Sequence, residues 1–211
     1  MTTACRETTQ PPRRDHSRKG FTLTEIAIVL GIIGLILGAI WVAASAVYNN
    51  LRVSKTTTQL LQVTQAVRAM YATTSTVDPS ANMAVGAVGA GTFPATYAQA
   101  GVFPSDMVIS ATAPTVQDVW GGAAGVTATT TTAANDSFAV IFTGVPTAAC
   151  ISLLTGNTGS GRDVNMVGAS ATAPGGGTPG TTALPVLSGA AQGECGGASR
   201  TKSDVVFTFL K

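Results

Sequence analysis

Residues that carry enzyme chemistry are scarce in this chain of 211 residues. Its single histidine, His16, lies close to the amino terminus, and only three cysteines occur. No GxSxG, HExxH or P-loop motif is present. Histidine-dependent catalysis is therefore excluded beyond residue 16. Without a CxxC pair or a histidine cluster we predict no metal site and no cofactor, and we expect a protein that is not an enzyme.

Charge and aromatic side chains are also sparse, at 10% and 6% of the residues. A net charge of +2 is too small to predict direct nucleic-acid binding, and 45% hydrophobic residues are too many for a disordered chain. Five of the twelve basic residues precede Phe21, so the remainder is close to neutral. A near-neutral body rich in Thr, Ala and Gly suits a surface that packs against copies of itself, and it equally suits an ordinary secreted domain of low charge.

One uncharged segment runs from Ile26 to Val47, with Ser45 as its only polar residue. As a helix it would be about 33 Å long, enough to cross a hydrocarbon core of about 30 Å. The basic residues before it place the amino terminus in the cytoplasm. A secretory signal peptide cleaved at Ala44-Ser45-Ala46 and a plain membrane anchor both compete for this segment. Neither needs Glu25, a carboxylate at the edge of the apolar run where burial is costly.

Residues 18–25, Arg-Lys-Gly-Phe-Thr-Leu-Thr-Glu, are followed at once by the apolar run. This stretch resembles the type III signal of type IV prepilins. The resemblance implies that residues 1–20 are a leader, that a prepilin peptidase of the inner membrane cuts between Gly20 and Phe21, and that the enzyme then N-methylates Phe21. It also implies that Glu25 neutralises the terminal amine of a neighbouring subunit in a fibre. A simpler role for Glu25, as an acidic residue near a helix amino terminus, is compatible with this one.

We predict one long helix over residues 21–72, of which about 26–47 span the membrane. Gly34 and Gly38 form a GxxxG pair that allows close helix–helix approach, although glycine is also simply common in membrane helices. Beyond Tyr48 an apolar stripe follows one helical face, with polar residues between its members. The stripe consists of Val53, Leu60, Val63, Val67 and Met70, and Gln59, Gln62, Gln65 and Arg68 lie between them. The resemblance to type IV pilins implies an α+β ladle fold, in which this helix packs on an antiparallel sheet.

Residues 73–211 are predicted to form an extracellular head. Residues 137–143, 162–167 and 204–210 are predicted strands, and residues 96–100 a possible short helix. A second short helix is expected to have Pro146 in its first turn and to be ended by Gly156 and the glycines within residues 159–161. Residues 174–179 are predicted to form a loop. Residues 116–126, with the sequence Trp-Gly-Gly at 120–122, resemble the start of the sheet in type IVb pilins.

Cys150 and Cys195 lie downstream of the apolar segment 26–47. If that segment directs the rest of the chain across the membrane, the two cysteines meet an oxidising compartment, where they can pair. A disulfide between them also matches the carboxy-terminal loop of the pilin family. We rate a reactive thiol pair as the weaker alternative, because no basic residue closely flanks Cys150.

The resemblance implies a structural subunit, close to type IVb major pilins, that polymerises with itself into a surface fibre for adhesion, conjugation or related contact. Its expected partners are its own copies, the prepilin peptidase and the pilus assembly machinery. The expected location is the inner membrane for the prepilin and the extracellular pilus afterwards. A pseudopilin of a type II secretion system, which shares the leader and the long helix, and a minor pilin are the alternatives.

Overall fold

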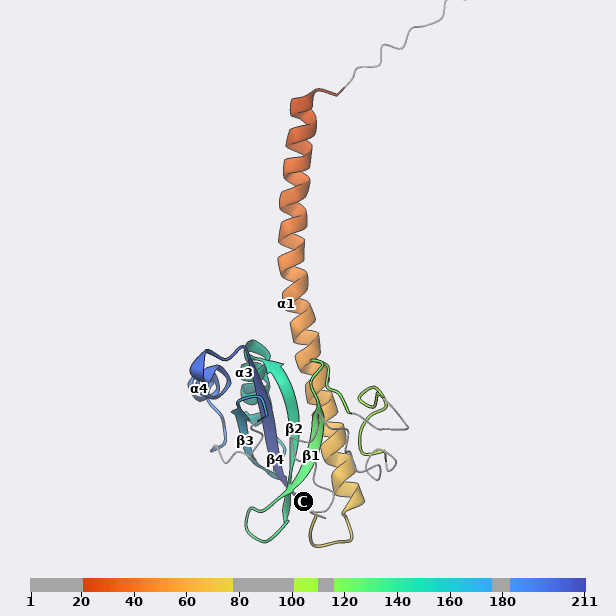
Figure 1. The fold of residues 1–211 in the computed structure, drawn as a ribbon, viewed down its shortest axis with the longest axis vertical. Coiled ribbons are helices and arrows are strands. Elements are labelled where there is room, and N and C mark those ends of the chain that lie inside the picture. The colour runs from red at the N-terminus through yellow and green to blue at the C-terminus, as the bar shows by residue number, and fades with distance from the viewer. Residues whose placement is uncertain (1–20, 78–100, 110–115, 176–182) are drawn as a thin grey trace, which may run out of the picture. The chain divides into compact units, whose positions relative to one another are not determined.

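A computed structural model describes residues 21–77, 101–109, 116–175 and 183–211. Its regular elements separate into a first unit that ends at Ser45 and a second that begins at Ala46. The predicted helix at 96–100 and the leader lie outside the described residues. In chain order the elements are α1 (Leu23–Met70), β1 (Ala124–Thr129), β2 (Ser137–Pro146), α3 (Thr147–Thr158), β3 (Met166–Thr172), α4 (Ser188–Gly196), the short 3₁₀ helix η3 (Gly197–Ser199) and β4 (Lys202–Leu210) (Figure 1).

The single long helix predicted from the sequence is confirmed as α1, which has 48 residues. It begins where Thr22 accepts the N–H of Glu25 at its side-chain oxygen, over 3.3 Å. This bond satisfies one of the free N–H groups at the helix start. Helix α1 runs through both units. Its first part has no buried residue, whereas its last part has six.

The face of α1 that packs in the second unit is close to the predicted stripe. Leu60, Val63 and Val67 are fully buried. Met70, expected on this face, is 40% exposed, because α1 ends there and Tyr71 enters the core instead. Gln59, expected on the polar side, is buried, and its amide donates to Asp106 Oδ2 over 3.1 Å.

Four antiparallel strands form one sheet in the order β1-β2-β4-β3 (Figure 1). The last strand of the chain therefore lies inside the sheet, between β2 and β3. This position explains why the apolar residues 205–209 of β4 are all buried. The predicted combination of a long amino-terminal helix with an antiparallel sheet is confirmed.

Side chains alternate between the two faces of the sheet, as the period of a strand requires. Phe138, Val140 and Phe142 of β2 join the main core, in which Phe138 stacks on Phe209 at a ring distance of 5.7 Å. The intervening residues Ala139 and Ile141 form a small second cluster with one residue of β4, Val206.

Several element boundaries differ from the sequence predictions. Pro146 is the last residue of β2 rather than part of the first turn of a helix. Helix α3 runs through Gly156 to Thr158 and ends before Gly159, one of the glycines expected to end it. Thr158 Oγ1 donates to Leu154 O and accepts the N–H of Val186, so the last turn of α3 is held in place.

The strand predicted at 162–167 begins only at Met166 and continues to Thr172. Residues 162–165 form a turn instead, in which Met166 N donates to Asp163 O over 3.0 Å. The helix α4 was not predicted, because its sequence Ser-Gly-Ala-Ala-Gln-Gly-Glu-Cys-Gly has no apolar period.

Candidate functional site

The amino-terminal motif lies at the start of α1. Gly20 falls outside the described residues, and Phe21 is exposed. Thr22, which caps the helix, and Glu25 have the spacing of a capping box. Only half of that box is formed, because the Glu25 N–H reaches Thr22 while no bond from the Glu25 carboxylate is present among the described residues. The carboxylate is therefore exposed and available to another partner.

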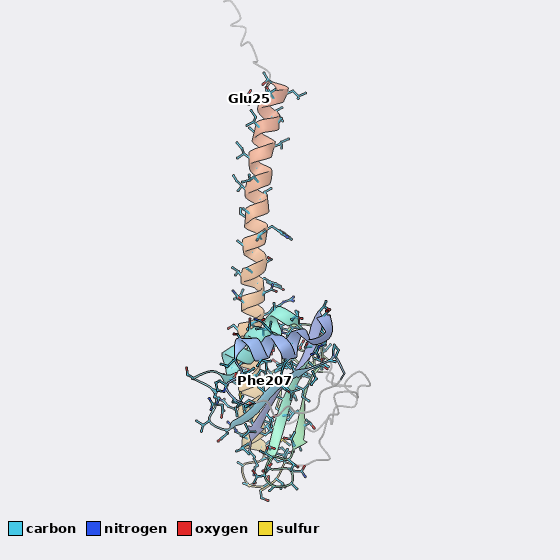
Figure 2. All side chains as sticks on the ribbon, turned by 90° about the vertical axis from the view of Figure 1, so that its left-hand side faces the viewer. Glu25 and Phe207 are labelled. Carbon is cyan, nitrogen blue, oxygen red and sulfur yellow. A yellow bond between two sulfur atoms is a disulfide. The ribbon has the colours of Figure 1, made fainter. Side chains whose placement is uncertain are left out.

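Every residue from Phe21 to Leu51 is exposed, including all the large apolar side chains. Figure 2 shows these side chains standing out around the helix that begins near Glu25. In the described part of the chain, α1 is also the helix that is long and apolar enough to cross a membrane. Such a surface is unstable in water, so the segment must be covered by lipid or by other helices.

Gly34 and Gly38 lie on this uncovered segment, and nothing within 4 Å occupies the space that a side chain would take at either residue. One turn of helix separates them, so both lie on one face. The backbone there is accessible to a second helix. The structure thus leaves room at this face for the predicted helix–helix contact.

The head contains a disulfide between Cys150 of α3 and Cys195 of α4, as predicted. Both cysteines are completely buried, and their Cα atoms are 5.9 Å apart. Ser203 at the start of β4 donates its hydroxyl to the Cys195 carbonyl over 2.8 Å. The disulfide therefore fixes the two short helices to each other, and Ser203 fixes α4 to the sheet.

The turn at residues 118–122 explains why Trp-Gly-Gly stands before the first strand. Asp118 Oδ1 accepts the N–H groups of Trp120 and Gly122, over 2.8 and 2.9 Å. Gly121 has a φ of +82°, a conformation that favours glycine. A Cβ on Gly122 would overlap the Thr143 carbonyl of β2. The turn can therefore close only with this pair of glycines.

The same turn directs Trp120 toward α1. Its indole Nε1 donates to Thr56 Oγ1 over 3.1 Å, and so links the sheet edge to the helix. Behind the turn, burial raises the pKa of the Asp118 carboxyl to about 6, against the opposing effect of its backbone hydrogen bonds. Its second oxygen, Oδ2, is buried and has no partner among the described groups.

Two ion pairs fix the buried end of α1 to the head. Arg68 binds both oxygens of Asp163 over 2.7 and 3.1 Å, and this contact lowers the pKa of the Asp163 carboxyl. Lys55 lies 2.8 Å from Asp106 in a more exposed pair, which lowers the pKa of that carboxyl as well. Nothing in the sequence pattern indicated these pairs, since Arg68 and Asp163 are 95 residues apart.

The described residues contain no group of three His, Cys, Asp or Glu side chains able to hold a metal ion. The described geometry is that of an uncovered apolar helix with a lone carboxylate, followed in sequence by a head in which a disulfide links two short helices beside the sheet. This geometry provides surfaces for association.

Comparison with known proteins identifies the family. The family described as PilS N terminal matches residues 51–209. The chain belongs to the PilS family of type IV pilins. Residues 15–41 in addition match the prokaryotic N-terminal methylation motif, which covers the predicted cleavage position and Glu25.

Two solved structures are similar to this chain. The type IVb pilin of Salmonella typhi superimposes with a TM-score of 0.52 at 20% identity, covering 77% of this chain and 99% of that one. At this identity the likeness establishes the fold. TcpA, a type IV pilin of Vibrio cholerae El Tor biotype, has a TM-score of 0.48 at 16% identity, covering 75% of this chain and 98% of that one. No curated protein matches the chain.

As a pilin, the chain is a structural protein and not an enzyme, as expected from its composition. Sequence reasoning found the disulfide and the apolar helix of this pilin. It missed Asp118 as the residue that organises the Trp-Gly-Gly turn. The sequence does contain a signal for this turn, since Asp118 stands shortly before Gly121 and Gly122. Aspartate side chains often accept hydrogen bonds from nearby backbone N–H groups in turns.

Proposed function

We propose that this pilin is a structural subunit of a type IV pilus. In this proposal the precursor lies in the inner membrane with its amino terminus in the cytoplasm. Prepilin peptidase removes residues 1–20 and methylates Phe21. The pilus assembly machinery then polymerises the mature chain, as a major subunit, into a surface fibre.

The observation that carries the proposal is the uncovered apolar part of α1. Its isoleucine, leucine and valine side chains are exposed over seven turns of helix, and none of the most apolar window is buried. Two environments can cover such a surface in succession, the hydrocarbon core of a membrane and a bundle of identical helices. A subunit that passes from a membrane into a fibre needs both, whereas a plain anchor needs only the first.

Glu25 supports the fibre stage. Its carboxylate is not used in the helix cap, and it is the only charged side chain on α1 before Arg52. In a bundle of apolar helices an unpaired amine on Phe21 is expensive to bury, at several kcal/mol. A carboxylate one turn into the neighbouring helix would pair with that amine and thereby set the register between subunits. Gly34 and Gly38 would let the helices approach closely enough for the pair to form.

The head separates this proposal from its main alternative. Pseudopilins share the leader and the long helix, so those parts cannot distinguish the two. The PilS match covers residues 51–209, which is almost the whole head. This match supports a pilus subunit over a pseudopilin.

The test uses two substitutions of Glu25. Glu25→Ala and Glu25→Gln should give protein that is cleaved and inserted in the inner membrane, with few or no sheared surface fibres. Ser45→Ala is the matched control, since the Ser45 hydroxyl only donates to Val42 O within the helix, over 2.8 Å. That variant should assemble normally. A normal fibre yield from both Glu25 variants would show that register is set elsewhere.

Processing is tested separately by mass spectrometry of the amino-terminal peptide of the fibre protein. The proposal requires a peptide that begins at N-methylated Phe21. A peptide that begins at Val47 would reveal secretory cleavage after Ala46 and would overturn the proposal.

A further inference from the structure

Arg52 is a half-buried cation without a carboxylate partner among the described residues. Its guanidinium carbon lies 4.5 Å from the centroid of the Tyr48 ring and 5.5 Å from that of the Trp120 ring. Nη2 donates to the Tyr48 hydroxyl over 3.2 Å. The two rings hold the guanidinium in place, and the bond to Tyr48 uses one of its five N–H donors. The remaining donors are positioned to bind an anion.

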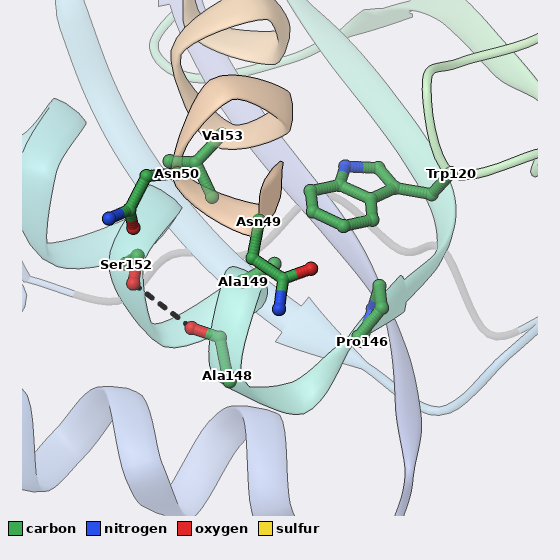
Figure 3. A pocket seen from close by; sticks show the side chains of 8 residues that line it. All are labelled: Asn49, Asn50, Val53, Trp120, Pro146, Ala148, Ala149 and Ser152. Atoms are coloured by element: carbon green, nitrogen blue, oxygen red, sulfur yellow. Dashed lines mark hydrogen bonds between the residues drawn. The ribbon is translucent and has the colours of Figure 1, made fainter. Parts of the chain in front are cut away.

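Trp120, which contacts the Arg52 guanidinium, also lines a hollow of about 120 Å³, whose lining side chains are drawn in Figure 3. Its polar lining comes from the side chains of Asn49, Asn50 and Ser152, and Val53 belongs to its apolar lining. Both asparagine side chains are exposed, so their amide groups are accessible to a ligand. Neutral polar groups beside a fixed cation suit an anionic group that carries a polar substituent.

The position of this cluster along α1 sets its depth in a membrane. Val47 is the last residue of the uncharged segment, and Tyr48 follows directly. Arg52 lies five residues beyond Val47, about 7.5 Å further along a helix. Tyrosine rings favour the membrane–water interface, and arginine side chains near a span end reach the headgroups. With the apolar segment in the hydrocarbon core, Arg52 therefore follows the end of the span closely enough in sequence to reach the headgroup phosphates.

We propose that Arg52, held by Tyr48 and Trp120, binds the phosphate of a phospholipid headgroup, with the adjacent hollow receiving the polar substituent of that phosphate. The site would act while the pilin waits in the membrane, so this inference rests on the proposed function. Extraction into a fibre would require release of the lipid.

A carboxylate on a second copy of the chain is the competing partner for Arg52. The described head offers no unpaired one. Each of its carboxylates is paired with a cation, buried or bonded to backbone N–H groups: Asp106, Asp118, Asp136, Asp163, Glu194 and Asp204. A lipid phosphate therefore fits the free cation better than a neighbouring head does.

The test measures lipid binding to the full chain in mild detergent by native mass spectrometry. The probes are phosphatidylglycerol, a diacylglycerol that lacks the phosphate, and inorganic phosphate as competitor. Arg52→Gln should bind phosphatidylglycerol about ten-fold more weakly than the wild type, since a charge-assisted phosphate bond is lost. Lys55→Gln, one turn along and already paired with Asp106, is the matched control and should bind normally. Diacylglycerol should not distinguish the variants.

Equal phosphatidylglycerol binding by wild type and Arg52→Gln would overturn the lipid site. Full displacement of the lipid by millimolar inorganic phosphate would assign the site to free phosphate instead. Loss of fibres from Arg52→Gln with unchanged lipid binding would assign Arg52 to a subunit contact. Carbonate extraction of reconstituted vesicles keeps the two proposals apart. A wild-type chain that fails to stay in the bilayer contradicts the proposed function, whereas a retained chain with no effect of Arg52→Gln contradicts the lipid site alone.

Discussion

Gly122 is the residue whose substitution should show most clearly how the head is built. A Cβ at this position would overlap the carbonyl group of Thr143, which belongs to the backbone of β2. A backbone atom cannot rotate away, so Gly122→Ala must push the 118–122 turn off the sheet. The first interactions lost would be those between Ala123 and Thr143.

Three hydrogen bonds join those two residues. Thr143 N donates to Ala123 O over 2.9 Å, Ala123 N donates to Thr143 Oγ1 over 2.7 Å, and Thr143 Oγ1 donates back to Ala123 O over 3.0 Å. Each is worth about 1 kcal/mol, and the lower entropy of an unfolded chain with alanine offsets less than about 1 kcal/mol. We expect Gly122→Ala to lower the free energy of unfolding by about 2–3 kcal/mol.

The assay is urea unfolding of the full chain in detergent, followed by Trp120 fluorescence in a Trp41→Phe background. Trp41 lies in the exposed apolar segment, so its removal leaves the head unchanged. Gly156→Ala is the matched control, because Gly156 lies within α3 with nothing within 4 Å of the added Cβ. It should raise the free energy of unfolding by about 0.5–1 kcal/mol. If Gly122→Ala were as stable as the wild type, the argument from close packing of the turn would be wrong.

The remaining predictions use the same unfolding assay. Asp163→Asn should lower stability by about 1–3 kcal/mol, because it leaves the half-buried Arg68 guanidinium without its carboxylate; a loss below 0.3 kcal/mol would contradict a structural role for the pair. Asp118 has a folded pKa of about 6, above its ordinary 3.8, so the folded state holds its proton more tightly than the unfolded chain does. The free energy of unfolding should therefore fall by up to about 3 kcal/mol as the pH rises from about 4 to about 6. Asp118→Asn should abolish that fall, and a variant with the same pH profile as the wild type would contradict the raised pKa. Replacing both Cys150 and Cys195 by Ala should lower stability by about 2–4 kcal/mol, since the disulfide closes a separation of 45 residues, and equal urea midpoints would show that it does not stabilise the head.

Features that depend on local patterns could be predicted from the sequence. An uncharged run from Ile26 to Val47 can only be a helix that avoids water, because its backbone groups must bond within the segment. The β-branched and aromatic residues 204–210 favour a strand wherever they are placed in the fold. The cysteine pair followed from export and from the small number of cysteines.

The burial of particular polar residues and the position of the last strand depend on contacts between distant parts of the chain. Gln59 is buried because it bonds Asp106, 47 residues away, and a local pattern cannot contain that partner. Helix α4 is stabilised by the disulfide and by packing on α3 rather than by its own glycine-rich sequence. The insertion of β4 between β2 and β3 likewise depends on contacts between distant segments, whose free energy no single stretch of sequence carries.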